Sequence, residues 1–203
     1  MPKINQNKMT IIGLTGGLAT GKTTVAEILR SLGHVVVCTD AIAHEVVKPG
    51  QPAFKKMVKE FGETILKDGA LNRTKMAELV FAKPVKRKKL EAIVHPYVRK
   101  EVKKVMAVFK KQGLKTLFID VPLLFETDFY TLCDQTICVT APQYVQIERA
   151  KKYRKMTKKN ALARIKSQMP LKAKGNRADY VVTNNGTKQH LRAVVKKILK
   201  SLL

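Results

Sequence analysis

Residues 16–23 (GGLATGKT) have the residue types and spacing of a phosphate-binding loop, G-x-x-x-x-G-K-[ST]. Its glycines permit positive φ values and let backbone amides approach an anion closely. Lys22 is expected to bridge the β- and γ-phosphates of a nucleotide, and the Thr23 hydroxyl to ligate Mg²⁺. The motif therefore predicts binding of ATP or GTP. The predicted nucleotide-binding residues of the loop are Gly17, Leu18, Ala19, Thr20, Gly21, Lys22, Thr23 and Thr24.

Two aspartates stand at the ends of predicted strands, where ligands bind in α/β folds. Asp40 could accept a proton from an attacking hydroxyl or help to hold Mg²⁺. Its alternative role is to cap a helix that starts at Ala41, and both roles can coexist. Asp120 resembles a Walker B acid and is a weaker candidate, for indirect contact with Mg²⁺.

Five short apolar runs rich in β-branched residues alternate with helical patterns, which predicts buried parallel strands joined by crossover helices. The expected fold is a doubly wound, three-layer α/β/α arrangement with a five-stranded parallel sheet. The last predicted helix, Thr187–Leu203, has one apolar stripe that should pack on the sheet. The predicted strands are Thr10–Thr15, Val35–Cys38, Thr116–Val121, Gln135–Thr140 and Tyr180–Thr183.

The segment between the second and third predicted strands is too long for one crossover. It contains helical patterns at about Ala53–Phe61, Arg73–Phe81 and Val85–Lys111. We interpret residues 52–111 as a helical insertion that covers a substrate. No linker separates independent domains, so residues 9–203 are expected to form one domain behind a polar tail, residues 1–8.

The composition is that of a basic globular protein. It combines 45% hydrophobic residues with a net charge of +25, which excludes a fully disordered chain. No apolar run approaches the roughly 18–20 residues that span a bilayer, and the start lacks a secretory signal. We expect a cytoplasmic protein without a membrane partner, and the sequence does not decide between a monomer and a small homo-oligomer.

The positive charge is concentrated late in the chain. Residues 141–203 hold 17 basic and 2 acidic side chains, and the densest run is Arg149–Lys159. Such a run can attract polyanionic substrates or a nucleic acid. The chain has no tryptophan and only 6% aromatic residues, which disfavours nucleic acid as a partner. Two anionic substrates still do not require +25, and the surplus has no functional account.

Several further motifs, taken in order, resemble those of one enzyme family, the dephospho-CoA kinases. The resemblance covers nearly everything from Met9 onward. The motifs are TGGLATGKTT at 15–24, TDAIAH at 39–44, FG at 61–62, DGALNR at 68–73, VF at 80–81, HP at 95–96, VPLLFE at 121–126, QIER at 146–149, RIKSQ at 164–168 and ADYVVTNNG at 178–186.

The resemblance implies a P-loop kinase that transfers the γ-phosphoryl group of ATP to the ribose 3′-hydroxyl of dephospho-CoA, the last step of coenzyme A synthesis, with Mg²⁺. It implies that Asp40 is the general base, that Lys22 holds the ATP phosphates and that Arg149 lies near the transferred phosphate. It also implies a basic lid at about 149–160 and an adenine-side contact from Asn184. The implied substrate-binding residues are Asp40, Arg73, His95, Pro122, Leu123 and Leu124.

Several of these residues also have simpler interpretations. His95 precedes a proline and could only end a helix. Pro122, Leu123 and Leu124 could form a turn with core contacts, and residues 184–186 an ordinary turn. The family usually has a second arginine where this chain has Tyr153, so Arg154 would replace it or the role is weakened. The alternative function is that of a P-loop kinase acting on another nucleoside or nucleotide.

Overall fold

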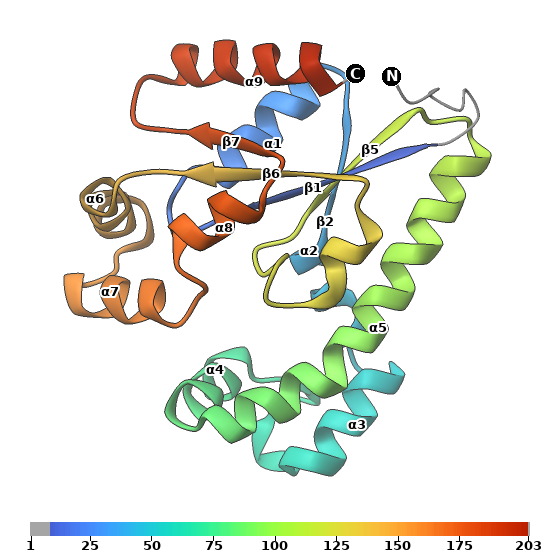
Figure 1. Ribbon diagram of the computed structural model, residues 1–203. Coiled ribbons are helices and arrows are strands. Elements are labelled where there is room, and N and C mark those ends of the chain that lie inside the picture. The colour runs from blue at the N-terminus through green and yellow to red at the C-terminus, as the bar shows by residue number, and fades with distance from the viewer. Residues whose placement is uncertain (1–8, 203) are drawn as a thin grey trace. The chain divides into compact units, whose positions relative to one another are not determined.

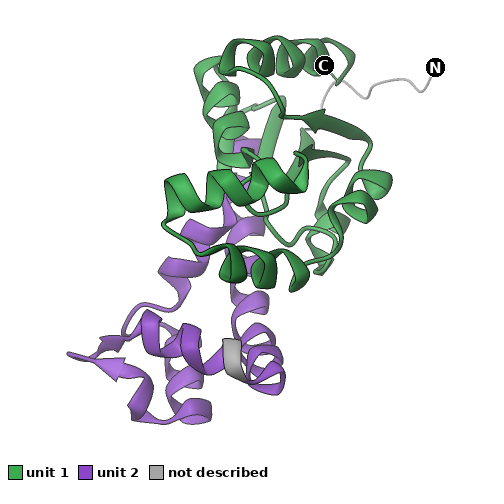
Figure 2. Cartoon of the chain, turned by 90° about the vertical axis from the view of Figure 1, so that its left-hand side faces the viewer, with its two compact units in different colours: residues 1–37, 112–203 green, residues 38–111 purple. Residues whose placement is uncertain are grey.

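The computed structural model describes residues 9–202, apart from the side chains of residues 81 and 82. The predicted polar tail, residues 1–8, lies outside the described residues. The chain divides into two compact units (Figure 2). Unit 1 comprises residues 1–37 and 112–203, and unit 2 comprises residues 38–111. Unit 2 thus contains the predicted helical insertion and begins earlier, at Cys38.

A five-stranded parallel sheet forms the centre of unit 1, in the order β2-β5-β1-β6-β7 (Figure 1). The central strand β1 pairs with β5 on one side and with β6 on the other, so that Leu14 is level with both Asp120 and Ile137. All five predicted strands are confirmed. Their bounds are β1 Thr10–Gly16, β2 Val35–Cys38, β5 Thr116–Asp120, β6 Gln135–Thr140 and β7 Tyr180–Thr183.

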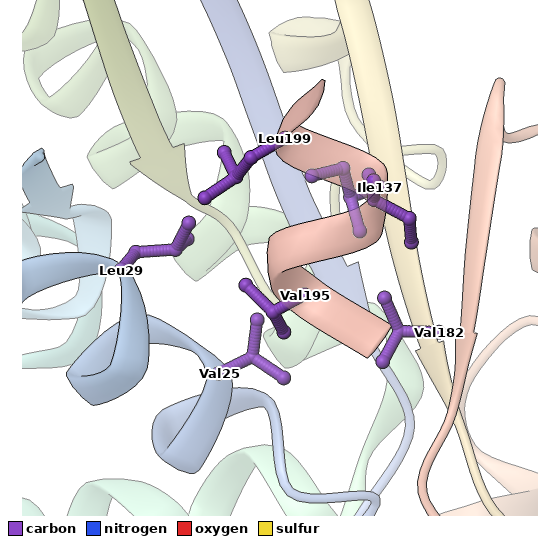
Figure 3. A pocket seen from close by; sticks show the side chains of 7 residues that line it. Val25, Leu29, Ile137, Val182, Val195 and Leu199 are labelled. Atoms are coloured by element: carbon purple, nitrogen blue, oxygen red, sulfur yellow. The ribbon is translucent and has the colours of Figure 1, made fainter. Parts of the chain in front are cut away.

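Alternate residues of the strands face α1 (Lys22–Ser31) and α9 (Lys188–Leu202), as the two-residue period of a strand requires. The side chains that meet there point toward one another in Figure 3, and the space between them has no room for a water molecule. Burial of each such aliphatic side chain contributes about 1.5–3 kcal/mol. The predicted apolar stripe of the last helix is confirmed. The side chains that meet between the sheet, α1 and α9 are Val25, Leu29, Ile137, Val182, Val195, Ile198 and Leu199.

The opposite face of the sheet is covered by α8 (Leu171–Arg177) and by the connection between β5 and β6. A Cβ on Gly13 of β1 would lie 2.9 Å from a Leu124 methyl carbon and 2.8 Å from the Cys133 sulfur, so these two side chains would have to shift. Unit 1 therefore has the expected three layers. Its remaining helices are the 3₁₀ helix η2 Asp128–Leu132, α6 Gln143–Arg154 and α7 Lys158–Lys166.

Unit 2 consists of helices and one small hairpin. The long helix α5 packs against α2, α3 and α4. The hairpin was not predicted, although Asp68 and Gly69 at its turn have φ values of 51° and 74°, as Asp-Gly turns require. The elements are α2 Thr39–Val46, α3 Pro52–Phe61, the 3₁₀ helix η1 Glu63–Ile65, β3 Leu66–Lys67, β4 Ala70–Leu71, α4 Arg73–Ala82 and α5 Pro84–Lys111.

Two of the simpler interpretations are wrong. α5 continues through Pro96, so His95 does not end a helix. Proline disfavours the helical conformation of its predecessor, but the packing of α5 against three other helices outweighs that preference. Asp40 does not cap a helix that starts at Ala41, because α2 begins at Thr39 and its N-cap residue is Cys38.

The longer helices are amphipathic or highly charged. Within residues 9–202, none combines the length and the hydropathy that crossing a membrane requires.

Candidate active site

The phosphate-binding loop connects β1 to α1, as its motif predicts. Gly21 precedes α1 with φ 94°, a conformation that favours glycine, and Ala19 has φ 53°. The buried Thr20 hydroxyl donates to the Gly17 carbonyl over 3.1 Å and closes the turn. Among the described residues, no side chain caps α1. The first amides of α1 and the positive end of its dipole are thus available to an anion.

Lys22 and Asp120 form an ion pair beside the loop. Their side chains are only 15% and 7% exposed, so the pair is weakly screened by solvent. Pairing of β1 with β5 brings Asp120 to the same edge of the sheet as the loop. The Asp120 carboxylate thus lies next to the loop lysine, at the end of the strand that neighbours β1.

Arg149 and Asn184 hold the loop from the β6–β7 side. The Asn184 carboxamide donates to the Thr20 carbonyl over 2.8 Å. The Arg149 guanidinium donates to the Asn184 carbonyl over 3.0 Å and to that of Thr20 over 3.5 Å. A side chain on Gly21 would overlap the Asn184 amide nitrogen. Asn184 is therefore buried against the loop, which an ordinary turn residue would not be.

The predicted lid consists of the second half of α6, a turn at Lys155 and the start of α7. Leu18 of the phosphate-binding loop packs with Ala150 and Ala161 of these helices. Because Leu18 is buried, only its backbone is available to a nucleotide. Of the two lid residues where the chain departs from the family, Tyr153 is 71% exposed and Arg154 is also exposed.

The loop that follows β5 is fixed by buried polar contacts. The Pro122 carbonyl accepts hydrogen bonds from Thr15 over 3.1 Å and from Lys174 over 2.9 Å. Leu124 is fully buried, whereas Pro122 and Leu123 are half-buried. Core packing thus explains Leu124, and the other two remain accessible in part.

Lys174 was not predicted as a site residue, because a lysine in a short helix is ordinarily exposed. It is fully buried, and its ammonium also pairs with Glu126 over 2.8 Å. Burial is the main reason that the pKa of the neighbouring Cys138 thiol is raised to about 11, with Lys174 lowering it and Glu126 raising it. The nearby Cys133 thiol has its pKa raised to about 12, first by burial and then by Asp134. Both thiols are therefore protonated and unreactive at neutral pH.

The remaining predicted site residues lie in unit 2. Asp40 is exposed in the first turn of α2, two residues after β2 ends. Arg73 is the first residue of α4 and is exposed, and the Asn72 side chain caps that helix by accepting from the Lys75 amide. His95 is half-buried in the middle of α5.

The residues of unit 1 fit a Mg²⁺–nucleotide. Thr23 is exposed at the start of α1 and presents its hydroxyl one residue after Lys22. Asp120 offers a carboxylate at the same edge of the sheet. One hydroxyl and one or two carboxylates are the oxygen donors with which proteins hold Mg²⁺, the remaining ligands being phosphate and water. The donor set thus suits Mg²⁺ bound together with a nucleotide.

Known proteins resemble this chain over nearly its whole length. The family model "CoaE: Dephospho-CoA kinase" matches residues 10–190. A dephospho-CoA kinase of Bacillus anthracis is 42% identical over 192 residues, which are 92% of this chain and 96% of the relative. The crystal structure of TT1252 from Thermus thermophilus has a TM-score of 0.82 at 32% identity and covers 96% of this chain and 98% of its own. A dephospho-CoA kinase from Campylobacter jejuni has a TM-score of 0.71 at 26% identity with the same coverage. The chain belongs to the dephospho-CoA kinase family.

Proposed function

We propose that this protein transfers the γ-phosphoryl group of ATP to the ribose 3′-hydroxyl of dephospho-CoA and so produces coenzyme A. One observation carries the proposal: the phosphate-binding loop presents Lys22 beside Asp120 in a chain of this family. Phosphoryl transfer depends mainly on positioning the reactants and neutralising negative charge. The amides at the start of α1 and the Lys22 ammonium provide both for the ATP phosphates.

Mg²⁺ would be held by the Thr23 hydroxyl and by Asp120, and it would supply charge neutralisation at the β- and γ-phosphates. When the ATP phosphates arrive, the Lys22 ammonium exchanges its contact with Asp120 for contacts with phosphate oxygens. The Asp120 carboxylate would then be able to hold Mg²⁺.

The acceptor side of the reaction needs a base. Asp40 is assigned this role because its carboxylate is exposed in the first turn of α2, two residues after the end of β2. It would accept the proton of the 3′-hydroxyl as the oxygen attacks the γ-phosphorus. Arg149 has further N–H groups beyond its contacts with Thr20 and Asn184, and these would neutralise charge on the transferred phosphoryl group.

The acceptor itself is assigned four further contacts in the same proposal. Arg73 would pair with its phosphates, while His95, Pro122 and Leu123 would contact its nucleoside and pantetheine parts.

The deciding experiment measures ADP release with dephospho-CoA, AMP, dTMP and CMP as acceptors. We expect turnover with dephospho-CoA and with none of the other three acceptors, and we expect mass spectrometry to detect coenzyme A as the product. Chelation of Mg²⁺ should abolish turnover. Full turnover of another acceptor with none of dephospho-CoA would overturn the proposal. Lys22→Ala serves as the control and should lower kcat by at least about 10³-fold, because it removes a charge that stabilises the transition state.

A further inference from the structure

Lys174 is a fully buried cation that has no role in the chemistry proposed above. A lysine ammonium is costly to bury unless it is paired and hydrogen-bonded, and an uncharged residue would fill the same space without that cost. The exposed Lys172, two residues earlier on α8, shows the ordinary environment of a lysine in this helix. The burial of Lys174 therefore calls for an account of what its contacts achieve.

Those contacts connect two separate segments of unit 1. The ammonium donates to the Pro122 carbonyl over 2.9 Å and pairs with Glu126 over 2.8 Å. The same Glu126 oxygen accepts from the Met169 backbone amide over 3.0 Å. Lys174 and Glu126 thus join the start and the end of the loop after β5 to the segment between α7 and α8.

The Pro122 carbonyl also belongs to the phosphate-binding machinery. It accepts a second hydrogen bond from Thr15, a fully buried residue just before the loop, over 3.1 Å. Pro122 follows Asp120, the partner of Lys22, by two residues. The Pro122 carbonyl oxygen therefore connects three elements: β1, which leads into the phosphate-binding loop, β5, which ends at Asp120, and α8.

A second residue of α8 contacts the same loop. The Arg177 guanidinium donates to the Phe125 carbonyl over 3.2 Å and lies over the rings of Phe125 and Tyr130, 4.8 and 5.2 Å from their centroids. Helix α8 thus contacts the loop at its start through Pro122, in its middle through Phe125 and at its end through Glu126. The loop lies on the β5 side of β1, whereas Arg149 and Asn184 hold the nucleotide loop from the β6–β7 side.

We propose that Lys174 is a positioning residue that holds residues 122–127 in the conformation that receives the acceptor substrate. The assignment of this loop to the acceptor rests on the proposed function. With Lys174 replaced by an apolar residue, Glu126 loses its cation and the Pro122 carbonyl retains only Thr15. The loop then samples other conformations, and the acceptor must order it on binding.

The first test compares Lys174→Met with Lys172→Met, a control of identical chemistry on the same helix. We expect Lys174→Met to raise the KM for dephospho-CoA about tenfold, the effect of losing one buried charged contact, and to change the KM for ATP less than about twofold. Lys172→Met should match the wild type. A purely structural role would reduce the fraction of active enzyme, which lowers kcat and leaves both KM values unchanged, and that outcome would overturn the proposal.

The second test measures amide hydrogen exchange without any substrate. In Lys174→Met, the amides of residues 123–127 and 169 should exchange at least about tenfold faster than in the wild type, while those of α1 are unchanged. Unchanged exchange in the loop overturns the proposal. If Lys174→Met does not fold, Glu126→Gln, at a partly exposed side chain, removes the same ion pair and should show the same pattern. A wild type that does not phosphorylate dephospho-CoA overturns the proposed function, while the exchange measurement still decides whether Lys174 holds the loop.

Discussion

The carboxamide of Asn184 orients a peptide group of the phosphate-binding loop. It donates to the Thr20 carbonyl over 2.8 Å, and the Asn184 backbone amide itself donates to the Thr140 carbonyl over 2.8 Å. In a planar trans peptide the carbonyl and the next N–H point in opposite directions. The Gly21 amide therefore points away from Asn184. A side chain at the far end of the sequence thus sets the direction of an amide in the loop.

Replacing Asn184 with alanine should destabilise the protein and weaken ATP binding. The Thr20 carbonyl keeps only the longer contact from Arg149, and an inadequately bonded buried carbonyl costs about 1–3 kcal/mol. We expect a similar fall in the free energy of unfolding in urea and an increase of about tenfold in the Kd for ATP. Asn185→Ala, at the exposed neighbouring position, is the control and should leave both values unchanged. Equal effects of the two substitutions would contradict this role of Asn184.

Asp40→Asn separates a catalytic carboxylate from a structural one. The substitution keeps size and hydrogen bonding but removes the group that accepts the proton. We expect kcat to fall by about 10²–10⁴-fold, the usual contribution of a general base, with the Kd for ATP changed less than about threefold. The lost charge in the first turn of α2 should cost only about 0.3–1 kcal/mol of stability. Equal losses in ATP affinity and kcat would instead assign Asp40 to Mg²⁺ binding.

Helix α5 contains a proline at its centre, which makes its continuity a consequence of packing. Pro96 cannot donate to the carbonyl of Ala92, and its ring crowds that carbonyl. Val98 and Val102 are buried beyond the proline, and α5 packs against α2, α3 and α4. These contacts hold the helix together where the local sequence alone would interrupt it.

Pro96→Ala should therefore stabilise the protein. Restoring one backbone hydrogen bond and relieving the ring contact is expected to raise the free energy of unfolding by about 1–3 kcal/mol, measured in urea. Pro84→Ala is the matched control, since Pro84 is the first residue of α5, where proline fits without loss of a hydrogen bond. A rise for Pro84→Ala equal to that for Pro96→Ala would contradict the explanation.

The elements that could be predicted from the sequence are those with a local signal. The β-branched runs predict all five strands of the sheet, and the glycine-lysine motif predicts the loop between β1 and α1. Strands of two residues, such as β3 and β4, are too short to show a period, and only the Asp68-Gly69 turn marks them. The start of α2 is also ambiguous, because threonine and aspartate are both typical N-cap residues.

The parts of the site that the sequence does not predict depend on contacts between distant residues. Lys174 and Glu126 are 48 positions apart, and neither residue type predicts burial. Asn184 reaches Thr20 across 164 positions. The sequence does mark residues 184–186 by their motif, but their contact with the phosphate-binding loop requires the parallel pairing of β7 with β6 and of β6 with β1.

At the scale of the whole molecule, the charge of +25 is distributed unevenly. Among the described basic residues of 141–203, Arg149, Lys174 and Arg177 contact the loops of the site, whereas Lys152, Lys158 and Lys159 are exposed on the lid, Lys152 beside the Tyr153 ring. Exposed charges act mainly through the long-range potential, which concentrates anionic substrates and is screened by salt. The lid lysines lie on the two helices that pack against Leu18 of the phosphate-binding loop.

The position of these lysines, rather than the total charge, should set the salt dependence of the reaction. We expect kcat/KM for ATP to fall about tenfold between about 20 and 200 mM salt, because the Debye screening length decreases from roughly 20 to 7 Å over that range. Replacing Lys152, Lys158 and Lys159 with glutamine should lower kcat/KM at low salt and flatten this dependence. Replacing Lys196, Lys197 and Lys200, which are exposed on α9, with glutamine changes the net charge by the same amount and should preserve most of the salt dependence. If both triple variants flatten the dependence equally, net charge alone attracts the substrates and the lid run has no special role.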